Sequence, residues 1–179
     1  MKTEELFYNS DWINTNGNFI HRTAIVYDWV ELGTGNTIGA YCVIGGNGEI
    51  RGVNQEDFKG KVKIGNNNVI SELVTIQRPF DEGKYTIVGD NNIIMRGSHS
   101  GHDSIIGNNC EICCNVILGG YATVGDNSKI KLGVIIRNRL SVGANCVIGM
   151  GGMVVKNVPE GQVWMGNPAR FYKLNNKWS

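Results

Sequence analysis

Two closely spaced histidines are the residues in this sequence best suited to catalysis. His99 and His102 lie three positions apart in the segment Gly97-Ser-His-Ser-Gly-His-Asp103. A neutral imidazole can remove a proton from an attacking hydroxyl or amine, so either histidine could act as a general base. The third histidine, His21, directly follows Ile20 near the N-terminus and is interpreted as a structural residue.

Aliphatic residues that recur every six positions predict the element that carries these histidines. Ser100, between the two histidines, interrupts the longest run, and breaks in a local rule are expected at functional sites. The runs comprise Ile20, Val26, Leu32, Ile38, Ile44 and Ile50; then Ile64, Ile70 and Ile76; then Val88, Ile94, Ile106, Ile112, Leu118, Val124, Ile130, Ile136, Val142, Ile148 and Val154.

The rest of each six-residue unit predicts a short strand followed by a turn. The position four residues after each aliphatic residue is usually small or apolar, as at Cys110 and Ala122. Many units continue with Gly and Asn or Asp, residue types that tolerate left-handed backbone angles and can turn a corner. A helical period of 3.6 fits neither the six-residue step nor the many Ile and Val residues. Three units would close one triangular coil of about 18 residues.

This coil length predicts which residues lie beside His102. Residues that are 18 positions apart stack in one column, so His102 is followed by Gly120, Asn138 and Lys156. Neighbouring coils should be about 4.8 Å apart, as strands in a sheet are. A glycine one coil away leaves its backbone N–H open to hold a developing oxyanion. The column therefore predicts an acyl-transfer site in outline, whereas the alternative is that both histidines are surface polar residues between coils.

Two breaks in the repeat predict loops and, with the repeat itself, a domain organisation. We expect an N-terminal segment over 1–17, a coil over 18–158, and a C-terminal cap or tail over 159–179. Loops are predicted at about 51–61 and 77–87, where the aliphatic positions are lost. Loops on a rigid scaffold are where binding residues concentrate.

Composition and charge exclude several classes of partner. The 179 residues include 17 basic and 16 acidic ones, a formal charge of +1, so no electrostatic signature of nucleic-acid binding is present. No apolar run approaches the length of a membrane span, and the acidic N-terminus does not resemble a signal peptide, so we expect a cytoplasmic protein. The five cysteines do not form the paired clusters of a structural zinc site, and no metal site is predicted.

The repeat resembles that of the hexapeptide-repeat acyltransferases, over about residues 18 to 158. This resemblance implies an all-β, left-handed parallel β-helix that assembles as a homotrimer, with the site between neighbouring coils. Within it, the region from Glu49 to Gly120 is similar to the UDP-N-acetylglucosamine acyltransferases of lipid A synthesis. The matching segments are Val53-Asn-Gln-Glu-Asp-Phe-Lys59, Val74-Thr-Ile-Gln-Arg78, Val88-Gly-Asp-Asn-Asn-Ile-Ile-Met95, His99-Ser-Gly-His-Asp103 and Leu118-Gly-Gly-Tyr121.

The resemblance implies a role for each matching residue. His102 would be the general base, His99 a substrate-positioning histidine and Gly120 the oxyanion donor. Asp103 would orient a histidine, in the same subunit or across a subunit boundary. The residues expected to contact the nucleotide sugar are Gln55, Asp57 and Lys59, together with Gln77 and Tyr121, which stand where the family has histidines.

The acyl donor is less well defined by the resemblance. Arg137-Asn138 replace a His-Gln pair of the family, and Gly166-Asn-Pro-Ala-Arg170 is similar to the ending of acetyl-CoA-dependent hexapeptide transferases. We therefore expect acetyl-CoA, ahead of an acyl carrier protein, as co-substrate, and no tightly bound cofactor. The candidates to bind the donor are Arg137, Asn138, Lys156 and Arg170, each of which could equally be a solvated surface residue.

The predicted function is acyl transfer from a thioester to a hydroxyl or amine of a nucleotide-linked sugar. The alternative within the family is acyl-carrier-protein-dependent O-acylation of UDP-N-acetylglucosamine. A zinc enzyme like the γ-carbonic anhydrases is weighed as a further alternative, because it shares the coil, but His21 lies more than four coils from His99. A non-catalytic β-helix scaffold is the remaining alternative. Thiol catalysis is discounted, because Cys113 and Cys114 have no histidine in their columns.

Overall fold

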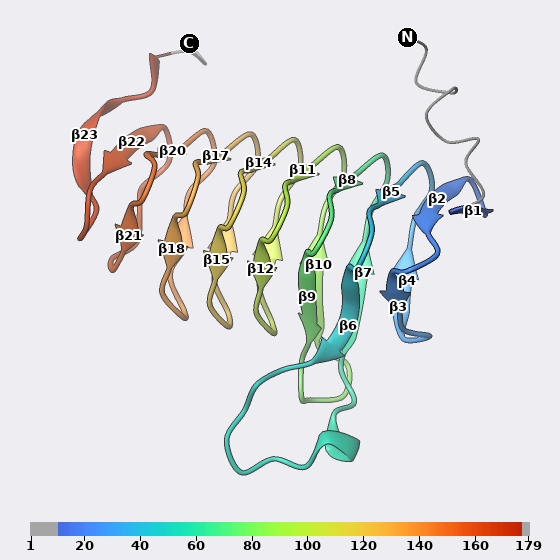
Figure 1. The fold of residues 1–179 in the computed structure, drawn as a ribbon. Coiled ribbons are helices and arrows are strands. Elements are labelled where there is room, and N and C mark those ends of the chain that lie inside the picture. The colour runs from blue at the N-terminus through green and yellow to red at the C-terminus, as the bar shows by residue number, and fades with distance from the viewer. Residues whose placement is uncertain (1–10, 177–179) are drawn as a thin grey trace, which may run out of the picture.

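The computed structural model describes residues 11–176, which wind into one long coil with three flat sides (Figure 1). Each turn of the coil contributes one short strand to each side, and successive turns pair in parallel. The register repeats every 18 residues over most of the length, as where Ile94 pairs with Ile112 and Leu118 with Ile136. The predicted parallel coil of six-residue units is confirmed.

The three sides are named sheets I, II and III. Sheet I contains β1 (Trp12–Thr15), β2 (Asn18–His21), β5 (Thr37–Ile38), β8 (Val69–Ile70), β11 (Ile93–Ile94), β14 (Glu111–Ile112), β17 (Lys129–Ile130), β20 (Val147–Ile148), β22 (Gln162–Met165) and β23 (Arg170–Leu174). Sheet II contains β3 (Ile25–Val26), β6 (Val43–Asn47), β9 (Thr75–Arg78), β12 (His99–Ser100), β15 (Ile117–Leu118), β18 (Ile135–Ile136) and β21 (Met153–Val154). Sheet III contains β4 (Val30–Leu32), β7 (Lys61–Ile64), β10 (Tyr85–Val88), β13 (Ile105–Ile106), β16 (Thr123–Val124) and β19 (Ser141–Val142).

The aliphatic residue of each six-residue unit forms the core between the three sheets. Ile38, Ile70 and Ile130 have 0% of their surface exposed, and the smaller inward residues, such as Cys42 and Val134, are buried with them. Because every strand is only a few residues long, the chain must turn a corner after each one. Several corners place Asn in the left-handed region, with φ of 56° at Asn109 and 59° at Asn127. The Gly-Asn and Gly-Asp pairs therefore make the turns that the sequence predicts.

A stack of buried asparagines joins the early coils in place of aliphatic residues. Asn36, Asn68 and Asn92 are each fully buried. The Asn68 amide nitrogen donates to Asn36 Oδ1 at 3.0 Å and to the Gly89 carbonyl at 2.9 Å, and Asn68 Oδ1 accepts the Asn92 backbone N–H at 2.9 Å. The side chains thus satisfy backbone groups that the corners leave unpaired.

Removing one member of this stack should lower the stability of the coil. Asn68→Ala leaves the Gly89 carbonyl and the Asn92 N–H buried without partners, so we expect the free energy of unfolding to fall by about 1–3 kcal/mol. Urea unfolding measures this difference. Asn54→Ala is the control, because Asn54 is exposed and its side chain makes no capping hydrogen bond. Equal stability of the two variants would contradict the role of the stack.

Two loops leave the coil. The first is shifted relative to the prediction, and the second is shorter than predicted. The first covers 48–60 and contains a single 3₁₀ turn, η2 (Gln55–Asp57), and the second covers 79–84. The first loop begins before the predicted residue 51 because β6 ends at Asn47, and it ends at 60 because Lys61 already pairs with Tyr85. The second loop is shorter than the predicted 77–87 because β9 continues to Arg78, which pairs with Asn47, and β10 begins at Tyr85. The longer loop projects below the coil in Figure 1.

The two ends of the coil also carry strands. Within the segment predicted as 1–17, β1 pairs antiparallel with β2, and residues 1–10 lie outside the described part of the chain. In the predicted C-terminal region, β22 extends sheet I beside β20 and β23 folds back on β22, with 177–179 outside the description. The described residues contain no helix with the length and apolar character needed to cross a membrane.

Candidate active site

His102 lies at the corner where β12 of sheet II passes to β13 of sheet III. Its side chain is 14% exposed, and its Nδ1 atom lies 2.8 Å from Oδ2 of Asp103. An ionised carboxylate can only accept, so this contact holds the ring proton on Nδ1 and leaves Nε2 with a lone pair. The arrangement is that of a general base oriented by an acid. Asp103 approaches the histidine of its own chain.

The backbone of Asp103 is hydrogen-bonded to the core of the coil. Asp103 has φ of 59°, in the left-handed region, and its N–H donates to Oγ1 of the fully buried Thr86 at 2.8 Å. The same conformation recurs at other corners, with φ of 62° at Tyr121 and 63° at Arg139, so it belongs to the turns of the coil. The hydrogen bond to Thr86 anchors the residue whose carboxylate contacts Nδ1 of His102.

Gly120 lies directly against the His102 ring, one coil further along. A Cβ atom on Gly120 would be 2.7 Å from Nε2 and 2.9 Å from Cε1 of His102. The N–H groups on either side are used, since Gly119 donates to the Ile136 carbonyl and Tyr121 to the His102 carbonyl, both at 2.9 Å. Within residues 11–176 the Gly120 N–H donates to no carbonyl or side chain. The structure thus brings the His102 imidazole next to a glycine whose backbone N–H is unused.

His99 stands on the outer face of sheet II, three residues before the base. Its Nδ1 atom lies 2.7 Å from Oγ1 of Thr75 on the neighbouring strand β9. Burial lowers the pKa of His99, the carboxylate of Glu49 opposes this shift, and the charge of His102 adds to it. His99 is therefore held neutral and hydrogen-bonded beside the base.

This environment predicts a pH dependence of stability. Because the pKa of His99 is lowered in the folded chain, the unfolded chain binds a proton more readily, and stability is lost as pH falls from 6.5 through the folded pKa. We expect His99→Gln, which cannot titrate, to lose less stability than the unsubstituted chain between about pH 7 and about pH 5.5. Urea unfolding at the two pH values tests this, and an identical pH dependence in both proteins would contradict it.

The predicted sugar-binding residues are only partly grouped at this corner. Tyr121 is there, with its ring edge-on to His102 at 5.2 Å and 84°. Gln77 is half-buried on β9, and Asp57 and Lys59 are exposed on the first loop. Gln55 is used by the protein itself, because Asn47 Nδ2 donates to its backbone oxygen at 2.7 Å and to its Oε1 at 2.9 Å.

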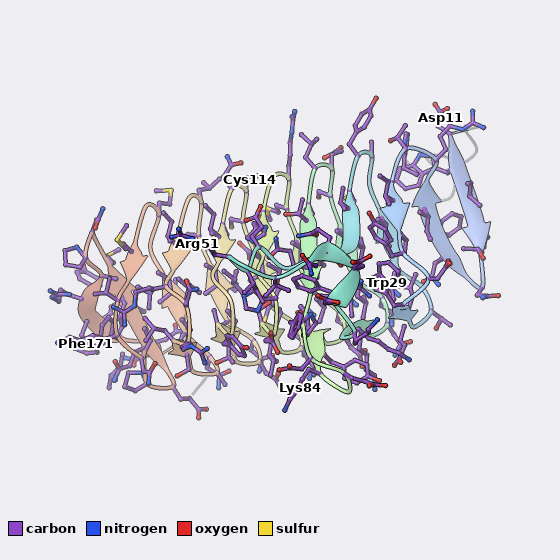
Figure 2. The ribbon with its side chains drawn as sticks, turned by 90° about the horizontal axis from the view of Figure 1, so that it is seen from below. Asp11, Trp29, Arg51, Lys84, Cys114 and Phe171 are labelled. Carbon is purple, nitrogen blue, oxygen red and sulfur yellow. The ribbon has the colours of Figure 1, made fainter. Side chains whose placement is uncertain are left out.

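The first loop nevertheless reaches the base. Gly48, its first residue, is buried, and a Cβ atom there would lie 3.0 Å from Cβ of His102 and 3.1 Å from its ring. The His102 side chain therefore packs against both Gly48 and Gly120. Seen from below the coil, the loop extends toward the later turns, with Arg51 near its far end (Figure 2).

The predicted donor-binding residues fall into two places. Asn138 lies one coil beyond Gly120, where its Oδ1 would be 2.5 Å from a Cβ on Gly119, and Arg137 beside it is exposed. Lys156 is exposed one coil further along the same corner. Arg170 is elsewhere, in β23 at the end of sheet I, and its Nη1 donates to the Ala169 carbonyl at 3.0 Å. The structure does not bring Arg170 to the His102 corner.

Two arginines beside the site escape the sequence reasoning. The guanidinium of Arg139 lies 4.1 Å from the centre of the Tyr121 ring, and that of Arg78 lies 3.7 Å from the centre of the Trp29 ring. Arg139 could have been found by extending the 18-residue column from Asp103 through Tyr121. Arg78 had no such signal, because its partner Trp29 is two coils away across a loop.

The described residues offer little support for the alternatives based on metal or thiol chemistry. Among residues 11–176, no cluster of three or more His, Cys, Asp or Glu side chains could hold a metal ion. Burial raises the pKa of the Cys42 and Cys110 thiols to about 11, and it also raises those of Cys113 and Cys146. Raised thiol pKa values disfavour the thiolate that nucleophilic catalysis requires.

Comparison with known proteins identifies relatives over part of the chain. No family model matches the sequence. The acyl-[acyl-carrier-protein]–UDP-N-acetylglucosamine O-acyltransferase of Thermodesulfovibrio yellowstonii is 34% identical over 46% of this chain and 45% of its own length. The enzyme of the same name from Synechocystis is 43% identical over 38% of this chain and 24% of its own length. The chain thus matches less than half of each of these curated relatives.

Solved structures match over most of the chain. The UDP-N-acetylglucosamine acyltransferase of Bacteroides fragilis has a TM-score of 0.83 and 31% identity over 89% of this chain and 62% of its own. The Francisella novicida enzyme has a TM-score of 0.78 and 25% identity over 88% and 71%. A variant of Caulobacter crescentus GDP-perosamine N-acetyltransferase, solved with CoA and GDP-perosamine, shares the fold at 22% identity and a TM-score of 0.61 over 87% and 56%.

These matches confirm both the predicted left-handed hand of the coil and the predicted resemblance. Three observations agree with one another: the sequence has a six-residue repeat, the structure is a three-sided parallel coil, and the relatives include sugar-nucleotide acyltransferases. The chain is a left-handed parallel β-helix of six-residue repeats, similar in sequence and in fold to the UDP-N-acetylglucosamine acyltransferases.

Proposed function

We propose that this chain transfers an acyl group from a thioester to a hydroxyl or amine of a nucleotide-linked sugar. The observation that carries the proposal is the pairing of His102 with Gly120. A base with its lone pair on Nε2 packs against Gly120, whose backbone N–H is free to donate. General-base removal of a proton and stabilisation of an oxyanion are the two requirements of acyl transfer.

In the proposed mechanism, each step of the reaction is assisted by one residue of the site. Nε2 of His102 accepts the proton of the acceptor hydroxyl or amine as that atom attacks the thioester carbonyl. The carbonyl oxygen becomes an oxyanion and accepts the Gly120 N–H. When the intermediate collapses, the carbon–sulfur bond breaks and the thiolate takes the proton from the His102 imidazolium. Asp103 stabilises that imidazolium through Nδ1 at 2.8 Å throughout.

Two donors are compatible with this mechanism. The names of the curated relatives specify an acyl carrier protein, whereas the Gly166-Asn-Pro-Ala-Arg170 ending favours acetyl-CoA. The exposed cations along the His102 corner, Arg137, Arg139 and Lys156, could pair with the phosphates that both donors carry. No tightly bound cofactor is required by either route.

The experiment is a thiol-release assay with the purified chain. UDP-N-acetylglucosamine is combined with acetyl-CoA or with acyl carrier proteins loaded with short and long chains, and mass spectrometry identifies the acylated sugar. We expect release of thiol with one donor class and a matching mass increase of the sugar nucleotide. Absence of acceptor-dependent thiol release with every donor would refute the proposal, and would favour a non-catalytic scaffold.

Exposed apolar side chains beside the site support assembly with further copies of this chain. Cavities of about 460 and about 370 Å³ lie on sheet I, and neither is lined by His99, His102 or Gly120. Beside His99 on sheet II, the apolar side chains of Ile117 and Ile135 are 42% and 37% exposed. A neighbouring subunit would cover these side chains and wall the site.

We therefore propose that the chain is a homotrimer in solution. Light scattering should give three times the chain mass of 19.6 kDa. Charging the exposed face with Ile117→Glu and Ile135→Glu should yield monomers, because two carboxylates would then have to be buried in the interface. A monomeric unsubstituted protein would contradict the proposal. The matched control is Ile93→Glu, on sheet I, where the side chain is also 45% exposed.

A further inference from the structure

Arg78 is a charged residue in a place where charges are seldom found. Its side chain lies at the end of β9, and the residue is only 8% exposed. No carboxylate within residues 11–176 forms an ion pair with it. Instead its guanidinium lies 3.7 Å above the centre of the Trp29 ring, and burial lowers its pKa. Burying an arginine without a carboxylate partner costs free energy. A structural role of Arg78 should therefore be found in the arrangement of the residues that contact its guanidinium.

The contacts of Arg78 lead to the first loop. Its Nε donates to Oδ1 of Asn47 at 2.7 Å. Asn47 in turn donates from Nδ2 to the backbone oxygen and to Oε1 of Gln55, at 2.7 and 2.9 Å. Gln55 begins the 3₁₀ turn of the loop. Arg78 thus holds the loop indirectly, through hydrogen bonds that Asn47 makes to both Arg78 and Gln55.

Trp29, on which the Arg78 guanidinium lies, contacts β6, the strand that leads into the loop. Trp29 Nε1 donates to the Gly45 carbonyl at 2.7 Å, and the Trp29 ring stacks on Tyr27 at 4.7 Å. Gly45 has φ of 92°, and a Cβ there would lie 3.0 Å from Trp29 Nε1. The indole therefore packs tightly against the end of β6 while it supports the guanidinium. In Figure 2, Trp29 lies next to the base of the loop.

The loop held in this way reaches both histidines of the candidate site. Gly48 packs against the His102 ring, and the charge of Glu49 acts on His99. Further along, the Lys59 N–H donates to the Phe80 carbonyl at 2.8 Å, which fastens the end of the loop that carries the exposed Asp57. A shift of the first residues of the loop would move the sugar-binding candidates, Asp57 and Lys59, together with Gly48, which packs against His102.

We propose that Arg78, with Trp29 and Asn47, is a positioning residue that sets the acceptor-binding loop over His102. The proposal rests on the proposed function for the identity of the acceptor, a nucleotide-linked sugar. We assign Arg78 an indirect role, through Asn47, because its Nε donates to Asn47 and its guanidinium face lies on Trp29. When a loop is in its competent position only part of the time, apparent affinity falls by that fraction.

Two variants break the network at different points. Arg78→Ala removes the guanidinium, and Asn47→Ala removes only the bridge and leaves the buried arginine in place. With either variant, we expect kcat/KM for UDP-N-acetylglucosamine to fall about tenfold with KM for the thioester unchanged, as for a loop that is in place in one tenth of molecules. The double variant should lose little more than either single one, because both act on one contact.

The matched control is Arg96→Ala, which removes an equal charge from an exposed turn at a different corner of the coil, between β11 of sheet I and β12 of sheet II. It should leave kcat/KM and both KM values unchanged. A fall equal to that of Arg78→Ala would overturn the proposal in favour of a general effect of charge.

Hydrogen exchange of the intact chain and calorimetric binding of UDP-N-acetylglucosamine make the test independent of catalysis. Amides of the 48–60 loop should exchange faster in Arg78→Ala and Asn47→Ala, with coil amides unchanged, and the sugar nucleotide should bind about tenfold more weakly. Unchanged loop exchange, or unchanged affinity, overturns the positioning role. If the unsubstituted chain binds the sugar nucleotide but transfers no acyl group, the proposed function fails while these two readouts still decide the role of Arg78.

Discussion

His102→Ala should lower kcat for acyl transfer by about 10²–10⁴ while KM for both substrates changes little. The reason is that proton removal occurs only as the transition state forms, whereas the groups that bind the substrates remain. Residual activity is expected, because the Gly120 N–H can still hold the oxyanion. The measurement is steady-state kinetics by thiol release, with the best donor from the function assay.

The matched control for this variant is His21→Ala. His21 lies at the first coil, with Nδ1 2.9 Å from Oγ1 of Thr23 and its ring edge-on to Trp12, so its loss should leave the kinetics unchanged. If His102→Ala retained full activity, His102 would not be the base, and the assignment would have to pass to His99.

Gly120→Ala should be nearly as damaging, although it removes no functional group. A Cβ atom would lie 2.7 Å from Nε2 of His102, closer than real Cβ contacts allow. The ring cannot move easily, because Gly48 also packs against this side chain and Asp103 holds Nδ1. A displacement of about 1 Å at a reacting group can cost about 10²-fold in rate, and we expect a loss in kcat of that order.

The control for this substitution is Gly149→Ala, on a different corner of the coil. There an added Cβ would meet only the flexible side chain of Met165, at 3.1 Å or more, so activity should persist. Neither glycine has a left-handed φ, so backbone strain does not separate the two variants. Full activity of Gly120→Ala would show that Nε2 does not need the space above Gly120.

The coil and the alignment of its residues were predictable because the interactions that create them are periodic. Each strand buries the same two positions of a six-residue unit, and each corner needs Gly, Asn or Asp. Periodicity also places residues that are 18 apart in contact, which is why His102 and Gly120 could be paired in advance. The strand-forming hexads and the stacked column therefore needed no tertiary information.

The loops were less predictable because they obey no repeat. Their bounds differ from the prediction because β6 ends at Asn47, while Arg78 and Tyr85 still lie in paired strands. The same holds for the function of single residues in them. Gln55, expected to face a substrate, is held by Asn47, and nothing in its local sequence indicates that contact.

The periodic sequence was enough to predict the parallel three-sided coil, the corner at which the histidines stand and the neighbour of His102, since all three follow from a regular step along one axis. The role of Asp103 was expected from the resemblance, and the structure places its carboxylate on Nδ1 of His102 in the same chain. The positions of Gly48 against His102 and of Arg78 on the Trp29 face were not predictable, because these contacts join segments whose separation is set by loops and side-chain packing. Their lengths and directions are not multiples of the repeat.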